Sequence, residues 1–268
     1  MEEPLIHRGP PGLFPLLLLL GMVAVWHALF RAGAKRRSRT GATVELGPIE
    51  SGVAGLLALI LAFSFNMASL RFEHREDVIV REANAIETAY LRCAFLTPSE
   101  QAGCRATLAR YAQARVALFE ARDDHTKLRE LLALSQSLQG ELWAGIVRSQ
   151  RELDRPSQGK MIDAANALID LHTERVAARL RIVPQEVTLV VFVLCLAWSA
   201  MAGYAFGLAC SYQIIPWIGF ATLACLVIFV SLDLDRPTAG FVRPRRGEAI
   251  MQELAVRLHA KQNRPTGP

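Results

Sequence analysis

The fold is decided by one uninterrupted stretch, residues 56–97, which reads LLALILAFSFNMASLRFEHREDVIVREANAIETAYLRCAFLT. The stretch begins apolar and becomes densely charged from Arg71 onward. Glycine and proline interrupt helices, and neither occurs in these 42 positions, so the stretch predicts one continuous helix. At about 1.5 Å per residue it would be roughly 63 Å long, about twice the hydrocarbon thickness of a bilayer. We therefore expect its first part to lie in lipid and its second part to project into water.

Apolar residues elsewhere in the chain are concentrated in blocks rather than dispersed. No charged residue occurs in residues 9–30, 51–70 or 187–232, and the last block is long enough for two crossings with a turn at 211–213. We therefore predict four transmembrane helices, at about 13–30, 50–70, 187–209 and 214–232. The first could instead be a signal peptide cleaved near Ala32-Gly33-Ala34. Its long apolar core and the preceding Glu2 and Glu3 argue against that alternative.

The remaining segments predict loops and polar helices. Residues 31–47 are expected to form a short loop, and Pro98 after Thr97 is typical of a helix start. Helices are predicted at about 98–122, 123–153, 158–182 and 247–260. The predicted fold is an all-α membrane protein with a helical extramembrane bundle inserted between its second and third transmembrane helices. The expected division is 1–12 (tail), 13–70 (first two crossings), 71–186 (extramembrane domain), 187–232 (last two crossings) and 233–268 (basic tail).

Charge and motifs restrict the function. The net charge is +5, and the excess of basic residues lies in segments that flank the membrane, which favours the lipid bilayer as a partner over nucleic acid. The chain has no glycine-rich phosphate loop, no zinc-protease motif, no nucleophile elbow and no paired cysteine metal motif. We therefore predict a protein that is not an enzyme and uses no metal and no cofactor.

Two cysteines, Cys93 and Cys104, flank the turn between two predicted antiparallel helices. A disulfide is reasonable if this side of the membrane is periplasmic, whereas free thiols are expected if it is cytoplasmic. The sequence leaves both possibilities open.

Polar and small residues inside the predicted crossings suggest close contacts. An asparagine within a membrane helix is costly to expose to lipid, so Asn66 is expected to face another helix or a pore. Ser199, Gly203 and Gly207 recur at intervals of four, a spacing that lets two helix backbones approach closely. We predict that this stripe packs against another helix of the same or a neighbouring subunit.

Several segments carry recognisable motifs: residues 57–69 with Arg71, 82–86 with 88–90, 169–172 with Arg175 and Val176, and, most specifically, Asp233, Asp235, Arg236 and Pro237 with Gly240. In order and spacing over about 50–245, these segments resemble a bacterial family of unknown function described as bestrophin-like. Bestrophins proper are anion channels. Their second crossing carries a Phe-x-x-Asn pattern, to which Phe63 and Asn66 are similar. The resemblance therefore implies a pore lined by Leu59, Phe63 and Asn66, with Arg71 and Arg75 at its mouth. The alternative for these two arginines is that they are ordinary cations at the bilayer edge, whose side chains extend into water. Gly55 takes the place of a further large neck residue, and the acidic run that binds calcium in animal bestrophins is absent, so no calcium gate is expected.

The resemblance implies a homo-oligomer, a pentamer if it follows bestrophins, that conducts inorganic anions such as chloride across the bacterial inner membrane. The alternative is a membrane-anchored helical module for sensing or scaffolding. Orientation is ambiguous, because eleven basic residues near membrane ends on the side of the middle domain exceed the five in 31–47, whereas the first helix alone favours the reverse. We expect a cytoplasmic middle domain.

Overall fold

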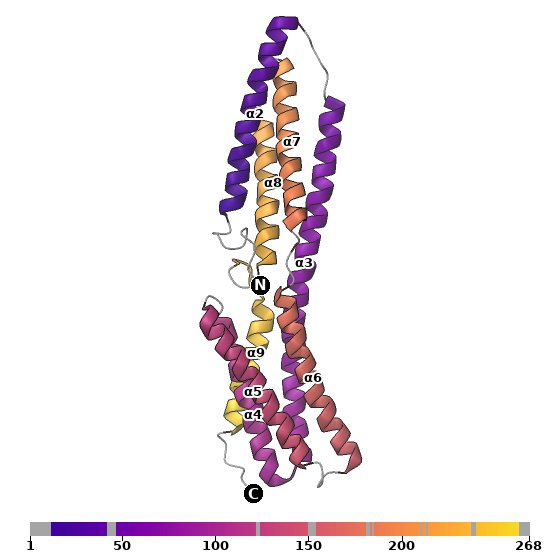
Figure 1. The fold of residues 1–268 in the computed structure, drawn as a ribbon, viewed down its shortest axis with the longest axis vertical. Coiled ribbons are helices and arrows are strands. Elements are labelled where there is room, and N and C mark those ends of the chain that lie inside the picture. Colours follow the sequence, from indigo (N-terminus) through magenta and orange to yellow (C-terminus); the bar gives the residue numbers. More distant parts are fainter. Residues whose placement is uncertain are drawn as a thin grey trace. The chain divides into compact units, whose positions relative to one another are not determined.

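All of the elements described by this computed structural model are helices (Figure 1). It describes residues 12–41, 47–121, 124–149, 154–180, 183, 185–209, 211–212, 214–236 and 240–262. The helices are α2 (Leu13–Thr40), α3 (Gly47–Arg92), α4 (Pro98–Glu120), α5 (His125–Ser149), α6 (Arg155–Leu180), α7 (Gln185–Ala209), α8 (Ile214–Asp235) and α9 (Arg245–Gln262), with a short 3₁₀ turn, η1 (Cys93–Phe95). Helices α2, α3, α7 and α8 are long and apolar enough to cross a membrane, which confirms the four predicted apolar helices.

The long helix predicted around residues 56–97 is α3, with 46 residues. It begins earlier than predicted, because Pro48 lies in its first turn, where the missing N–H of proline breaks no helical hydrogen bond. It ends at Arg92, before the 3₁₀ turn, rather than at Thr97. The next helix, α4, starts at Pro98 as predicted. The Thr97 side chain, which precedes it, forms no capping hydrogen bond to the backbone of α4.

The first helix extends further than predicted. Residues 31–40, expected to be part of a loop, continue α2 to Thr40, and the helix ends at Gly41 in the left-handed conformation, φ +66°. Gly33 within this segment lies against α7, where a Cβ atom would come within 2.5 Å of the Tyr204 carbonyl oxygen. The prediction of a loop from residue 31 was wrong because this glycine serves packing, and basic residues in a last turn suit the helix dipole.

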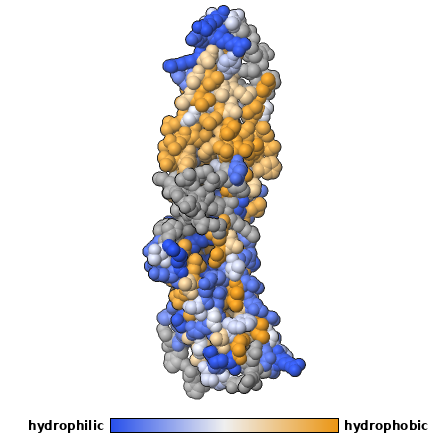
Figure 2. Space-filling view, viewed as in Figure 1, coloured by the Kyte–Doolittle hydropathy of each residue, from blue (hydrophilic) through white to orange (hydrophobic). Residues whose placement is uncertain are grey.

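The chain divides into two compact units. The first, called the membrane unit, comprises Met1–Arg71 and Ile182–Val242, and the second unit comprises Phe72–Arg181 and Arg243–Pro268. Figure 2 shows the apolar side chains gathered over the membrane unit. The sequence-based division differs at its C-terminal end, since it treated residues 233–268 as one tail, whereas α9 belongs to the second unit.

The membrane unit is built on close contact between α2 and α7. A Cβ atom at Gly203 would lie 2.3 Å from the Trp26 carbonyl oxygen, and one at Gly207 would lie 2.2 Å from that of Phe30. Ser199 is fully buried one turn earlier on α7, where its hydroxyl donates to the Cys195 carbonyl. The predicted stripe of small residues thus lies inside the subunit. The lack of side chains at Gly203 and Gly207 lets the backbones of α2 and α7 touch.

The second unit has its own apolar core, to which α9 contributes. Met251, Leu254 and Leu258 of α9 are almost completely buried in a cluster that includes Ile86 of α3 and Leu108 of α4. These α9 positions recur at three- and four-residue spacing, as one face of a helix requires. The amphipathic pattern of the predicted C-terminal helix is therefore satisfied by packing within the chain.

Candidate functional site

One face of α3 in the membrane unit remains open. The residues on it are exposed and follow at intervals of three and four: Leu56, Leu59, Phe63, Asn66 and Leu70. Phe63 is the most exposed of the four apolar residues, at 61%. A Cβ atom at Gly55 would meet nothing within 4 Å, so this glycine also lies beside open space. The three predicted pore-lining residues therefore share one face of one helix, which a single copy of the chain leaves uncovered.

The opposite face of α3 is packed. Leu57 is completely buried and Leu61 nearly so, in a cluster with Trp198 of α7 and Ile228 of α8. The helix therefore has one side held by its own subunit and one side free for a neighbour, lipid or water. Asn66 on the free side forms no hydrogen bond within the part of the chain that the structure describes. A polar amide in that position favours an aqueous or protein-lined environment over lipid.

The end of the membrane part of α3 is tied to the end of α8. Arg71 donates from Nε to Asp235 Oδ1 at 2.9 Å, and the backbone N–H of Val183 donates to Asp235 Oδ2 at 2.7 Å. The Asp235 side chain is fully buried, whereas that of Arg71 is 20% exposed. A buried carboxylate requires a positive charge or hydrogen-bond donors nearby. Asp235 therefore holds together α3, α8 and the segment at Val183, which are distant in the sequence.

The second aspartate of this motif shapes the chain after α8. Asp233 accepts the backbone N–H of Phe241 at Oδ1 and that of Val242 at Oδ2, both at 2.9 Å. Gly240 fits beneath this turn, where a Cβ atom would lie 2.8 Å from the Asp233 carbonyl oxygen. Arg236 is buried, and Pro237 lies outside the described residues. Both aspartates thus organise the backbone at the end of the membrane unit.

The predicted pore-mouth arginines do not continue the open face of α3. At about 100° per residue, Arg71 lies roughly 80° and Arg75 roughly 120° around the helix from Phe63. Arg71 is paired with Asp235, and Arg75 is half-buried and also interacts within the chain. Glu73 and Asp77, which follow further along the same helix, are both exposed. Any attraction of anions by the two arginines is therefore reduced by neighbouring carboxylates.

A buried ionic cluster in the second unit joins three helices. It consists of Glu82 on α3, Tyr111 and Arg115 on α4, and His172 and Arg175 on α6. Arg115 Nε lies 2.7 Å from Glu82 Oε1, the Tyr111 hydroxyl donates to the same oxygen at 2.9 Å, and Arg175 Nη1 donates to Glu82 Oε2. The side chains of Glu82 and Arg115 are at most 1% exposed. One buried carboxylate therefore compensates two guanidinium groups, which gives the cluster a net positive charge.

Burial and charge shift the titration of this cluster. The guanidinium groups of Arg175 and Arg115 outweigh the desolvation of Glu82, so the pKa of this carboxyl is lower than usual. Burial, with Arg115 at 3.3 Å from His172 Nδ1, lowers the pKa of His172. His172 is therefore neutral at pH 7, a hydrogen-bonded core histidine as its position on an apolar stripe suggests.

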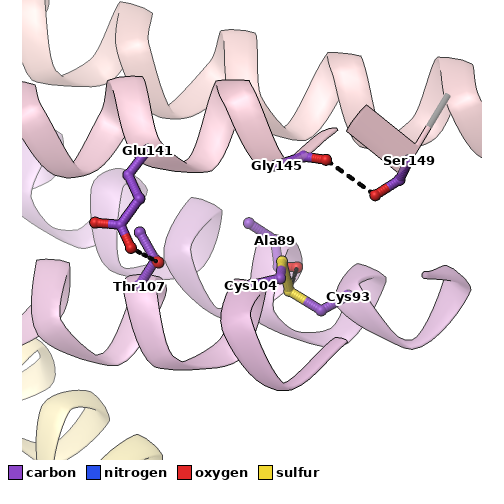
Figure 3. The surroundings of a disulfide bond; sticks show 7 residues. All are labelled: Ala89, Cys93, Cys104, Thr107, Glu141, Gly145 and Ser149. Atoms are coloured by element: carbon purple, nitrogen blue, oxygen red, sulfur yellow. Dashed lines mark hydrogen bonds between the residues drawn. A yellow bond between two sulfur atoms is a disulfide. The ribbon is translucent and has the colours of Figure 1, made fainter. Parts of the chain in front are cut away.

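The two cysteines whose oxidation state the sequence leaves open form a disulfide. Cys93 and Cys104 join the 3₁₀ turn to α4, with Cα atoms 6.0 Å apart (Figure 3). Nearby, the Thr107 hydroxyl donates to Glu141 Oε1 at 2.9 Å and links α4 to α5. Cys93 is completely buried and Cys104 nearly so. The bond therefore closes the corner between α3 and α4 from inside the second unit.

In the part of the chain that the structure describes, no group of three His, Cys, Asp or Glu side chains could hold a metal ion.

The sequence reasoning missed the pairing of Arg71 with Asp235, although an aspartate at the end of an apolar helix is a signal that a cationic partner is needed. It also missed the cluster, whose members Glu82, His172 and Arg175 occur in segments that carry the family resemblance.

The comparisons with known proteins agree with this architecture. No curated protein matches the chain. A structure of a bacterial bestrophin homologue from Klebsiella pneumoniae is similar with a TM-score of 0.65 and 14% identity, covering 94% of this chain and 98% of that one. A mutant of the same homologue has a TM-score of 0.67 and 14% identity, and the match covers 98% of this chain and 100% of that one. A mutant described only as a membrane protein has a TM-score of 0.70 and 14% identity, and the match covers 93% of this chain and 99% of that one. A family model described as Bestrophin-like domain matches residues 16–246. The chain is therefore a member of the bestrophin-like family.

Proposed function

We propose that this protein is an oligomeric ion channel that conducts inorganic anions such as chloride, and that it is not an enzyme. The assembly is a homo-oligomer, a pentamer by analogy with bestrophins, in the bacterial inner membrane. One α3 helix from each copy surrounds a central pore, with Leu59, Phe63 and Asn66 facing the ion path. The second unit lies outside the bilayer.

The observation that carries this proposal is the two-sided character of α3. Leu57 and Leu61 hold one side in the membrane unit, while the opposite side exposes Phe63 together with Asn66, an amide that has no partner in the described chain. Four mainly apolar helices do not enclose a hydrated path within one subunit. Copies arranged around their open α3 faces would give Asn66 water or a neighbouring chain and would create an apolar neck at Phe63.

Selectivity in this proposal comes from the apolar neck rather than from fixed positive charge. Arg71 is compensated by Asp235, and two exposed carboxylates, Glu73 and Asp77, follow on the same helix. An apolar constriction favours large, weakly hydrated anions, because they lose their water at lower cost. The sign of the permeant ion is therefore the most informative quantity to measure.

The test is recording from the purified full-length protein in a planar bilayer, after its oligomeric state has been established. A chloride gradient should give a reversal potential near the chloride equilibrium value, and Phe63→Ala should raise the conductance severalfold by widening the neck. Phe65→Ala is the matched control, because Phe65 is also exposed but lies about 160° around the helix. Absence of current at any voltage from a verified oligomer would refute the channel, and cation selectivity would refute anion conduction.

We also propose that the middle domain is cytoplasmic, on the count of eleven basic residues against five near membrane ends. A reporter that is active only in the cytoplasm, fused after Asp124, should then give signal. A cytoplasmic location would make the Cys93–Cys104 disulfide an exception, because cytosolic disulfides are rarely maintained, so thiol trapping of this pair is a second test of orientation.

The second candidate function, a membrane-anchored sensing or scaffolding module, is favoured by one observation, the buried Cys93–Cys104 disulfide. Structural disulfides are typical of oxidising compartments such as the periplasm. A periplasmic reporter signal together with an oxidised pair would invert the proposed orientation and favour this module, above all if bilayer recordings are silent.

A further inference from the structure

The end of α2 beyond its apolar part carries a surface whose role is not explained by a channel. From Arg31 to Arg39 the helix rises roughly 12 Å, enough to pass through the headgroup layer of one leaflet, which is about 5–8 Å thick. The basic residues in this segment are Arg31, Lys35, Arg36, Arg37 and Arg39. Figure 2 shows hydrophilic side chains at this end of the membrane unit, next to its apolar surface.

Two of these five residues hold α2 against the end of α7. Arg36 Nη1 donates to the Tyr204 hydroxyl at 2.8 Å. Arg37 Nη1 donates to the Leu208 carbonyl oxygen at 2.7 Å, near the C-terminal end of α7, where a positive charge suits the helix dipole. These contacts fix the rotation of the last turns of α2 and therefore the direction in which its other basic side chains point.

The other three form what we call the basic stripe: Arg31, Lys35 and Arg39. They follow at intervals of four on one face of α2, and all three are exposed. Like charges at this spacing repel one another. None of the three pairs with an acidic side chain in the part of the chain that the structure describes.

The basic stripe differs in this respect from exposed arginines of the second unit. Arg81 pairs with Glu174, Arg110 with Glu141 and Arg257 with Glu87. The stripe therefore differs from these three arginines, each of which has a carboxylate partner within its own unit.

We propose that the basic stripe binds the headgroups of anionic phospholipids. Lipid phosphates are the anions present at high density at the edge of the apolar part of α2, and guanidinium and ammonium groups bind phosphate through charge-assisted hydrogen bonds. Each basic side chain near an anionic membrane surface strengthens binding about fivefold, so the three together are worth roughly 100-fold. This role does not depend on whether the protein conducts ions.

The test is native mass spectrometry of the full-length protein in detergent, titrated with phosphatidylglycerol or with phosphatidylcholine of the same acyl chains. The wild type should retain phosphatidylglycerol selectively. The triple variant Arg31→Gln, Lys35→Gln, Arg39→Gln should bind it roughly 100-fold more weakly. The matched control is Lys127→Gln, Arg129→Gln, Lys261→Gln, which removes the same charge from exposed positions of the second unit and should bind like the wild type.

Three results would overturn the proposal: equal retention of the two lipids by the wild type, equal loss in the control variant, or full competition by millimolar inorganic phosphate. The last result would identify a general anion surface rather than a lipid site. A second variant guards against misfolding, since Arg31→Lys, Arg39→Lys keeps the charge and should bind within about twofold of the wild type. Loss of binding in that variant would show that charge is not the determinant.

Discussion

Replacing Glu82 by glutamine should destabilise the second unit strongly. The change removes the single carboxylate that compensates Arg115 and Arg175, whose side chains are only 1% and 14% exposed. The amide keeps the size of the side chain and can still accept the Tyr111 hydroxyl, so the main loss is charge compensation. Breaking a buried ion pair from one side typically costs about 3–5 kcal/mol, because the remaining charge stays desolvated.

The assay is thermal unfolding of the full-length protein in detergent, followed by circular dichroism. For a chain of this size each kcal/mol shifts the Tm by roughly 2–4 °C, so Glu82→Gln should lower the transition by about 10 °C. Glu87→Gln is the matched control on the same helix. Its partner Arg257 is 47% exposed, and an exposed pair contributes about 1 kcal/mol or less.

A second measurement separates charge from packing. Adding Arg115→Met to Glu82→Gln removes one uncompensated charge and should recover part of the lost stability, a non-additive result expected only for groups in contact. Charge compensation is refuted if Glu82→Gln shifts the Tm no more than Glu87→Gln does. It is also refuted if the loss of stability in the double variant exceeds the sum of the losses in the two single variants.

Three further predictions concern other contacts. Because burial and the Arg115 charge lower the folded pKa of His172, its contribution to stability is complete above about pH 6.5 and is lost as the pH falls through the folded pKa. His172→Gln should therefore flatten the decline of the Tm below about pH 6.5, and an unchanged pH profile would contradict this. Gly207→Ala places a Cβ atom 2.2 Å from the Phe30 carbonyl oxygen and should cost about 1–3 kcal/mol in thermal unfolding, whereas Gly219→Ala, at an open position, should be neutral. Asp235→Asn leaves Arg71 without its counter-charge and should lower the Tm by several degrees more than the exposed Asp77→Asn does; equal shifts would show that the buried pair adds no stability.

Much of the helical architecture could be predicted because its causes are local. The absence of glycine and proline in residues 56–97 predicts a long helix, and the charge-free blocks predict four apolar helices, as the structure shows. Pro98 marks the start of α4 for a similarly local reason, since proline is tolerated in a first helical turn. The family resemblance rests on short motifs and is also readable from the sequence. The pore-lining role of Leu59, Phe63 and Asn66 stays a prediction, because it depends on other copies of the chain.

Only the tertiary structure decides which distant residues meet. Arg71 looks like a free cation at a membrane edge until α8 brings Asp235 to it from 164 positions away. Glu82 looks like one of many surface charges until packing buries it between Arg115 and Arg175. Residues 31–40 look like a loop until α7 lies against Gly33, and the helix that continues past it aligns the basic stripe. Hydropathy and backbone preference act over a few residues, whereas the partner of a buried charge or a glycine is set by how whole helices pack.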